Sequence, residues 1–230
     1  MPLLELVTSS GLGSLLGMRH ALEPDHLAAV STLVTGERSG VKAAWLGACW
    51  GFGHTLTLLV AGATLVALRA QMPAAVSDAF EMGVALMLVG LGLRAIYGAA
   101  RQGPDGPPHL HHHGRLVHVH PGVPAHVHIG RWTLARRPLL VGAVHGMAGS
   151  GALTALVLAT LPSATAQLTY MAVFGLGSTA GMAALSAVVG WPLGRLARHP
   201  VLVRGISLAV GCVSTTLGVW WGYPLVGRLF

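Results

Sequence analysis

Charged residues are scarce in this sequence: Asp, Glu, Lys and Arg together make up 9% of its 230 residues. Because soluble domains carry about a quarter of their residues as charges, an ordinary water-exposed surface is excluded. Hydrophobic residues account for 53% of the chain. The composition therefore predicts a polytopic membrane protein of the all-α class, in contact with membrane lipid.

Cysteine is nearly absent from the chain. Its two cysteines, Cys49 and Cys212, lie in apolar segments far apart in the sequence, so we interpret them as small core residues. This spacing excludes a disulfide framework and a Cys-x-x-Cys metal site. A basic n-region is also missing from residues 1–16, and no cleavable signal peptide is expected. The net charge of +7 comes from basic residues scattered over connecting segments, which indicates membrane topology rather than a nucleic-acid partner.

Six apolar segments are each longer than the ~20 residues that cross ~30 Å of hydrocarbon. They are residues 3–34, 43–68, 80–100, 138–161, 167–192 and 204–227. The basic residues gather in alternate connections, namely Arg38, Lys42, Arg101, Arg115, Arg131, Arg136, Arg137, Arg195, Arg198 and Arg204. The other connections hold little beyond Arg69 and Arg228. The excess of positive charge predicts a cytoplasmic location for the first set and extracytoplasmic chain ends.

Two short motifs recur in the two halves of the chain, at offsets of 125 and 124 residues. The matches are Gly17-Met-Arg-His20 with Gly142-Ala-Val-His145, and Gly51-Phe-Gly-His54-Thr55 with Gly175-Leu-Gly-Ser178-Thr179. Because each half holds three crossings, the two copies must be inverted, as in many secondary transporters. We therefore expect a first three-helix membrane repeat (1–100), a cytoplasmic His-rich loop (101–137) and a second three-helix membrane repeat (138–230).

The first apolar segment contains four polar side chains around a proline: His20, Glu23, Asp25 and His26 flank Pro24. A charge at mid-bilayer costs roughly 2.5 to 3.5 kcal/mol, so such residues are expected to serve a function. On one continuous helix, His20 and His26 would lie about 120° apart. Since proline lacks the N–H and clashes with the preceding turn, we predict that the helix breaks near Pro24. The break would let both imidazoles and Asp25 face one point.

Imidazole and carboxylate ligands without a thiolate suit Ni²⁺, Co²⁺ or Zn²⁺. Further polar residues lie in the second and fourth segments, where neighbouring glycines permit close approach of another helix. The predicted metal-binding residues are His20, Asp25, His26 and His54. Possible further ligands, or residues that orient ligands, are Glu23, His145, Ser150, Thr55 and Ser178. Hydrogen bonding between helices is the alternative role for the histidines of the second and fourth segments.

The connection over residues 101–137 is rich in Gly, Pro and His and contains eight of the 13 histidines. This composition cannot form a packed core, so the loop is expected to be disordered or loosely ordered without metal. We interpret it as auxiliary cytoplasmic metal binding, with a low-complexity spacer as the alternative. Its histidines are His109, His111, His112, His113, His118, His120, His126 and His128.

The run from His20 to His26 resembles the His-x4-Asp-His signature of the nickel/cobalt transporter family, and Phe52-Gly-His54-Thr resembles that family's second motif. The whole chain is most similar to the compact urease-accessory-type nickel permeases. The resemblance implies transport of Ni²⁺, or Co²⁺, through a bacterial inner membrane into the cytoplasm, with His20, Asp25 and His26 in metal recognition. The chain departs from the signature in having Glu23 and Pro24 where Asp and Ala are common. Classical members have eight segments rather than six.

Three alternatives to metal uptake remain. The first is nickel or cobalt efflux by the same fold. A rhomboid-like intramembrane serine protease would use Ser150 in the run Ala148-Gly-Ser-Gly, but the sixth segment has no histidine to act as its base. An anion exporter would use Arg19 or Arg94, both near segment ends. We expect no enzyme activity and no cofactor: the metal ion is the transported substrate, and a cytoplasmic metallochaperone is a possible partner.

Overall fold

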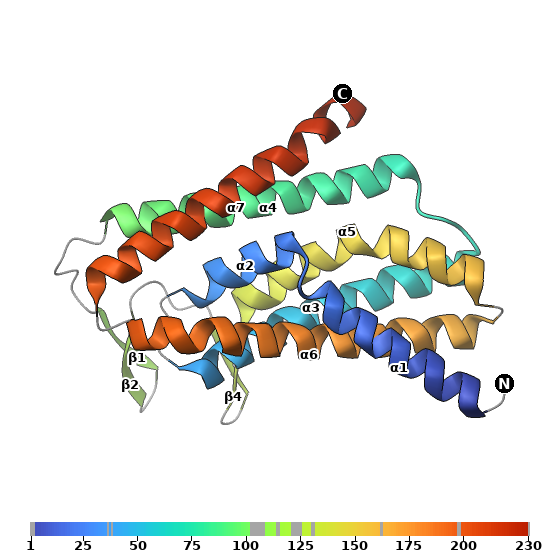
Figure 1. Cartoon of the computed structure of the whole chain (residues 1–230), viewed down its shortest axis with the longest axis horizontal. Helices are drawn as coiled ribbons and strands as arrows, with labels where there is room; N and C mark the ends of the chain where they lie inside the picture. Colours follow the sequence, from blue (N-terminus) through green and yellow to red (C-terminus); the bar gives the residue numbers. More distant parts are fainter. Residues whose placement is uncertain are drawn as a thin grey trace.

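The computed structural model describes residues 3–35, 37, 39–101, 109–113, 116–120, 126–129, 132–161, 163–196 and 199–229. Its helices are α1 (Leu3–His20), α2 (Pro24–Val34), α3 (Gly40–Leu68), α4 (Ala74–Arg101), α5 (Arg136–Thr160), α6 (Ala164–Leu196) and α7 (Pro200–Leu229). They form an elongated bundle (Figure 1). Each predicted apolar segment coincides with one helix, except that the first is divided between α1 and α2. The predicted helical fold of these segments is therefore confirmed.

Of the helices that the structure describes, four are long and apolar enough to cross a membrane, as judged by length and composition. They are Gly40–Leu68, Ala74–Arg101, Ala164–Leu193 and Val201–Leu229. This finding agrees with a membrane protein. The count of six crossings, and the arrangement as two repeats of three, stay predictions.

The predicted break in the first segment is confirmed. α1 ends at His20, and α2 begins at Pro24 after an extended residue, Glu23, with φ −64° and ψ 149°. Proline fits the first turn of a helix because its fixed φ is helical and its missing N–H would have no partner there. The break lies about midway along the bundle (Figure 1). The chain is thereby interrupted about halfway along the bundle, with Leu22, Glu23 and Pro24 exposed and the next two residues, Asp25 and His26, buried.

Glycines allow the helices to pack closely around this break. α3 packs against α5 and α6, α1 against α6, and α4 against α7. At Gly51, an added Cβ would lie 2.6 Å from the Cα of Thr179, and at Gly53 it would clash with the carbonyl of Leu139. The close approach predicted at both glycines is therefore confirmed, and larger residues would push α3 away from α5 and α6.

Contacts between the two halves occur in reciprocal pairs. Gly17 of α1 packs on the carbonyl of Phe174 in α6, and Gly142 of α5 packs on the carbonyl of Trp50 in α3. These residues correspond at the offsets of 125 and 124 found in the sequence. Two further sets of contacts are reciprocal in the same way. Gly51 packs on Thr179 and Gly175 on Thr55, and Gly177 packs on Ser14 and Gly53 on Leu139.

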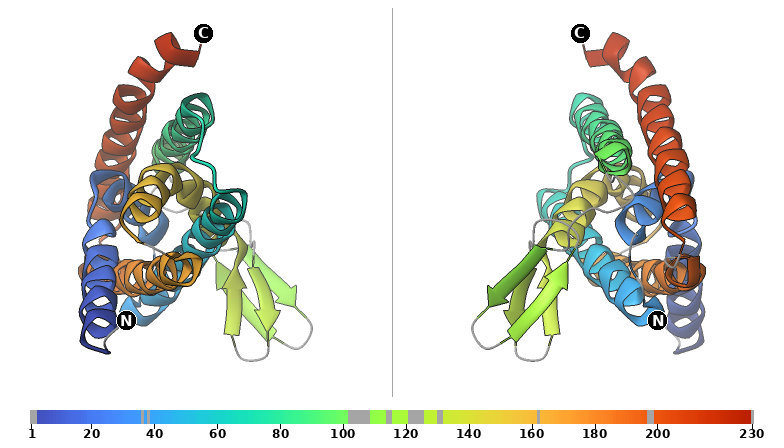
Figure 2. Two further views of the ribbon diagram at one scale, coloured as in Figure 1. Left: turned by 90° about the vertical axis from the view of Figure 1, so that its right-hand side faces the viewer. Right: turned by 90° about the vertical axis from the view of Figure 1, so that its left-hand side faces the viewer.

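The connection between α4 and α5 differs from expectation, because its described part forms two antiparallel hairpins rather than a loosely ordered loop. β1 (His109–His113) pairs with β2 (Leu116–His120), and β3 (His126–Ile129) pairs with β4 (Trp132–Ala135). Alternation of histidine with valine has the period of a β-strand, which explains the difference. The hairpins project from one end of the bundle, and both chain ends lie toward the other (Figures 1 and 2).

Candidate metal centre

The break before Pro24 brings together histidines that a straight helix would separate. The ring centroids of His20 and His26 are 4.4 Å apart. His54 of α3 lies 5.3 Å from His20 and 5.5 Å from His26, and His145 of α5 lies 4.1 Å from His26. Imidazoles from four helices thus meet at the middle of the bundle. The predicted convergence of His20, Asp25 and His26 is present, together with His54 and His145.

Two overlapping sets of three residues have the spacing of metal ligands. One is His20, His26 and His54, and the other is Asp25, His26 and His145. Within each set, one ligand atom from each residue lies within 4.8 Å of the others. His26 belongs to both sets and is therefore the central residue of the cluster.

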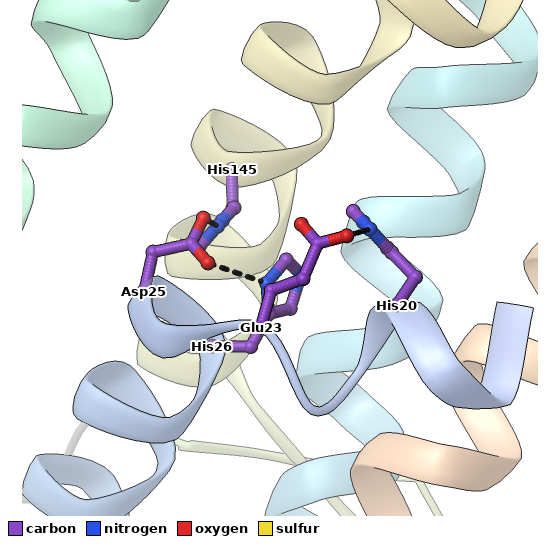
Figure 3. A network of polar contacts seen from close by, with 5 residues as sticks. All are labelled: His20, Glu23, Asp25, His26 and His145. Carbon is purple, nitrogen blue, oxygen red and sulfur yellow. Dashed lines mark hydrogen bonds and ion pairs between the residues drawn. The ribbon is translucent and has the colours of Figure 1, made fainter.

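Two carboxylates contact ring nitrogens of the neighbouring imidazoles (Figure 3). Glu23 Oε1 lies 3.0 Å from His20 Nδ1, and Asp25 Oδ1 lies 3.1 Å from His26 Nδ1. The other oxygen of Asp25 lies 2.7 Å from His145 Nε2. Asp25 is buried, whereas the side chain of Glu23 is half exposed. Asp25 therefore bridges two histidines on different helices.

The opposite nitrogens of these rings are buried and have no hydrogen-bond partner among the described residues. They are His20 Nε2, His26 Nε2, His145 Nδ1 and both ring nitrogens of His54. A buried polar atom without a partner typically costs about 1 to 3 kcal/mol, so several in one cluster need a compensating role. A histidine that ligates a metal commonly donates its other ring N–H to a carboxylate. His20 and His26 have this arrangement, with Nε2 free for a ligand.

Two aromatic residues that the sequence analysis did not predict line the cluster. The ring of Trp50 lies 5.4 Å from that of His26 and 5.8 Å from that of His145, and its Nε1 has no hydrogen-bond partner in the described part of the chain. The ring of Phe174 lies 5.4 Å from that of His20. Trp50 was predictable, since it precedes His54 by one helical turn and shares its face. Both rings are buried and lie beside the imidazoles.

The other predicted residues either do not belong to the cluster or have side chains that the structure does not describe. The hydroxyl of Thr55 donates to the carbonyl of Gly175 at 2.8 Å and lies 2.9 Å from Thr179 Oγ1, so it joins α3 to α6. Ser178 is buried, and none of the described residues forms a hydrogen bond with its Oγ. The side chains of Ser150 and of the histidines in β1–β3 are outside the described part. The strands themselves lie at the end of the bundle, away from the α1–α2 break (Figure 1).

Long apolar helices around a largely buried cluster of histidines with Asp25 define a helical, membrane-type protein with a candidate metal centre. The chain is 32% identical over 225 residues to the urease accessory protein UreH of Bacillus sp. strain TB-90, covering 98% of this chain and 95% of that protein. It therefore belongs to the family of the urease accessory protein UreH. The match confirms the resemblance to the urease-accessory-type family noted in the sequence.

More distant relatives come from Arabidopsis thaliana. The chain is 28% identical over 192 residues to the chloroplast protein FOR GROWTH AND FERTILITY 1, covering 80% of this chain and 50% of that protein. Its identity to FOR GROWTH AND FERTILITY 2 is 25% over 191 residues, covering 81% and 48%. No family model and no solved structure matches the chain. These comparisons give no support to the serine-protease alternative.

Proposed function

We propose that this protein carries Ni²⁺ through a membrane, with Co²⁺ as a second substrate, and that the ion binds at the α1–α2 break. The observation that carries the proposal is the set of buried, partnerless imidazole nitrogens of His20, His26 and His54. Nitrogen ligands without thiolates favour borderline divalent ions over Mg²⁺ and Ca²⁺, which prefer oxygen. A urease accessory relative points to nickel among these ions.

In this proposal the carboxylates orient the ligands. Asp25 accepts hydrogen bonds from His26 Nδ1–H and His145 Nε2–H, which fixes both rings and increases the basicity of their free nitrogens. Glu23 does the same for His20. His20, His26 and His54 then bind the ion directly, and His145 supports Asp25 from α5. In this arrangement Asp25 orients the imidazoles and does not itself coordinate the ion.

We further propose that the two halves form an inverted repeat of three crossings each. The reciprocal packing of Gly17 on Phe174 and Gly142 on Trp50 supports this arrangement, because a twofold relation between halves produces such exchanges. Transporters built in this way bind substrate near mid-membrane at the repeat interface. The contact between Asp25 of the first half and His145 of the second supports a site at this interface. Rocking of one half against the other would open the site alternately to each side.

The proposed direction is uptake into a bacterial cytoplasm, across the inner membrane, with the His-rich hairpins in the cytoplasm and both chain ends outside. The helix ends nearest the hairpins carry most of the described basic residues, which supports this orientation. These residues are Lys42, Arg101, Arg136, Arg137, Arg195 and Arg204. A cytoplasmic metallochaperone would then receive the ion.

The test is uptake of radioactive nickel into proteoliposomes of defined orientation, with Co²⁺, Zn²⁺ and Mn²⁺ as competitors. We expect saturable flux that His54→Ala abolishes. His199→Ala is a matched control, because His199 is exposed and lies outside the cluster. Flux that His54→Ala leaves unchanged would overturn the proposed site. Flux only from the cytoplasmic face outward would replace uptake by efflux.

A further inference from the structure

Trp50 of α3 and Phe174 of α6 occupy corresponding positions in the two halves of the chain. They are related by the offset of 124 residues that also relates the second repeated motif. Their packing is reciprocal, because Gly142 packs on the carbonyl of Trp50 and Gly17 packs on that of Phe174. Both side chains are buried, with exposed fractions of 0% and 6%. Each half of the chain thus contributes one aromatic ring at the same place in the repeat.

Each ring contacts a different part of the histidine cluster. The ring of Phe174 lies 5.4 Å from that of His20. The ring of Trp50 lies 5.4 Å from that of His26 and 5.8 Å from that of His145. A buried indole N–H usually has a hydrogen-bond partner, but Nε1 of Trp50 has none among the described residues. The orientation of the indole therefore depends on packing.

The two rings lie on opposite sides of His54 along the bundle. α3 runs from the hairpin end of the bundle toward the end where the chain termini lie (Figure 1), so Trp50 is one helical turn closer to the hairpins than His54. Leu58, one turn beyond His54, packs with Phe174, whereas Trp50 belongs to the buried apolar group that contains Met182. On α6, Phe174 and Met182 are separated by roughly 12 Å, at a rise of 1.5 Å per residue. Phe174 therefore covers the cluster toward the chain ends, and Trp50 covers it toward the hairpins.

We propose that Phe174 and Trp50 are the two gates of the histidine cluster: Phe174 closes the path toward the chain ends, and Trp50 closes the path toward the hairpins. This inference rests on the proposed transport function and names the side chains that alternating access would move. An inverted repeat exchanges the two faces of the membrane, so corresponding residues of its two copies serve opposite faces. With both rings buried, the structure corresponds to a form that is closed on both sides.

An aromatic ring at each position blocks an ion because it supplies no ligand atom and occupies the space that water would need. Hydrophobic constrictions close channels in this way. An ion that enters from the chain-end side has to displace Phe174 while Trp50 still closes the other side, and release requires the reverse. Replacement of one ring by alanine should therefore open the cluster to water from one face only. Phe174→Leu keeps most of the apolar volume and should keep the path closed.

The test measures access to the cluster from each face, with a thiol in place of the His54 imidazole. The full-length chain carries His54→Cys together with Cys49→Ala and Cys212→Ala, so that the thiol at position 54 is its only one. A charged, membrane-impermeant methanethiosulfonate reagent is added to one face of proteoliposomes of defined orientation, without nickel. We expect Phe174→Ala to accelerate labelling from the chain-end face, and Trp50→Ala from the hairpin face. Each increase should be about 10-fold or more, which corresponds to a barrier lower by roughly 1.4 kcal/mol.

Two control variants separate the opening of a gate from a general loosening of the bundle. Phe52→Ala removes an aromatic ring from the same helix as Trp50, but Phe52 is 54% exposed, so labelling from both faces should stay unchanged. Phe174→Leu should be labelled as slowly as the parent. An increase from both faces in Phe174→Ala, or no increase at all, would overturn the proposal.

Failure of this proposal is distinguishable from failure of the transport function. The labelling needs no metal and is measured in a chain that lacks the His54 imidazole, so it reports on closure alone. Nickel flux is measured in a chain with His54 intact and reports on transport. Absence of flux would refute transport, whereas labelling without a preferred face would refute the gates.

Discussion

Asp25 Oδ2 and His145 Nε2 lie 2.7 Å apart and join the start of α2 to the middle of α5. The two residues are 120 positions apart in sequence and are both buried. The other oxygen of Asp25 holds His26. One carboxylate therefore couples the broken first segment to the second half of the chain, and the shape of the cluster depends on it.

Replacement of Asp25 by Asn should test whether the carboxylate orients ligands or binds the ion. The amide keeps the size but loses the charge that holds His26 and His145, so nickel affinity should fall about 10- to 100-fold, as for outer-shell partners in other metal sites. Isothermal titration of the purified protein measures this. Glu23→Gln is the matched control, since its half-exposed side chain holds His20 alone and should have the smaller effect. Complete loss of binding in Asp25→Asn would instead identify a direct ligand.

Single replacements of His20, His26 or His54 by Ala should each abolish nickel transport while the protein remains in the membrane. Each removes one of three nitrogens of the same set. The helices do not depend on these rings for their backbone hydrogen bonds, so insertion should be unaffected. Radioactive nickel uptake, normalised to the amount of inserted protein, measures the effect. Normal transport by His26→Ala would show that the site assignment is wrong.

Gly17→Ala and Gly142→Ala should both destabilise the protein. A Cβ at Gly17 would clash with the carbonyl of Phe174, and at Gly142 with that of Trp50. Overpacking of this kind costs about 1 to 3 kcal/mol, and more where backbone must move. Gly90→Ala in α4 is the control, because a Cβ there meets nothing within 4 Å. Thermal unfolding in detergent should show lower midpoints for the first two variants only. Equal midpoints for all three would contradict the close packing.

Nickel binding should weaken as the solution becomes more acidic. Imidazole must be neutral to bind a metal, so binding competes with protons and releases any that the empty site holds. Between about pH 7.5 and pH 5.5, where histidine changes its charge, affinity should therefore decrease, and the decrease should be smaller in a variant lacking His20 and His26. Binding isotherms at several pH values measure this. An affinity that stays constant over this interval would assign the ion to oxygen ligands.

Local sequence signals were sufficient to predict the α1–α2 break. Pro24 removes an N–H and four polar residues surround it, so the interruption and the convergence of His20 with His26 followed from helix geometry. The close approach at Gly51 and Gly53 was also predictable, because only a residue without a side chain permits such contact. These features depend on a few neighbouring residues.

Features that depend on long-range packing were not predictable in detail. The pairing of Asp25 with His145 requires α2 and α5 to meet, and no local pattern specifies which nitrogen of each imidazole the carboxylate holds. The hairpins were missed for a different reason. The histidine content of residues 101–137 indicates metal binding, and the alternation His118-Val119-His120 within it has the period of two that predicts a strand.

Thr55 and Thr179 touch through their hydroxyls, as a residue touches its own copy across the axis of a homodimer. A short ancestral chain paired with itself would make this contact, and fusion of two copies would leave each free to diverge. At the corresponding positions, the first copy has Asp25, His26 and His54, and the second has Ser150, Gly151 and Ser178. On the repeat proposed above, specialisation of this kind would leave one asymmetric centre between two similar halves. Substitutions in the second half, His145 apart, would then alter the packing of the two halves more than the binding of the ion.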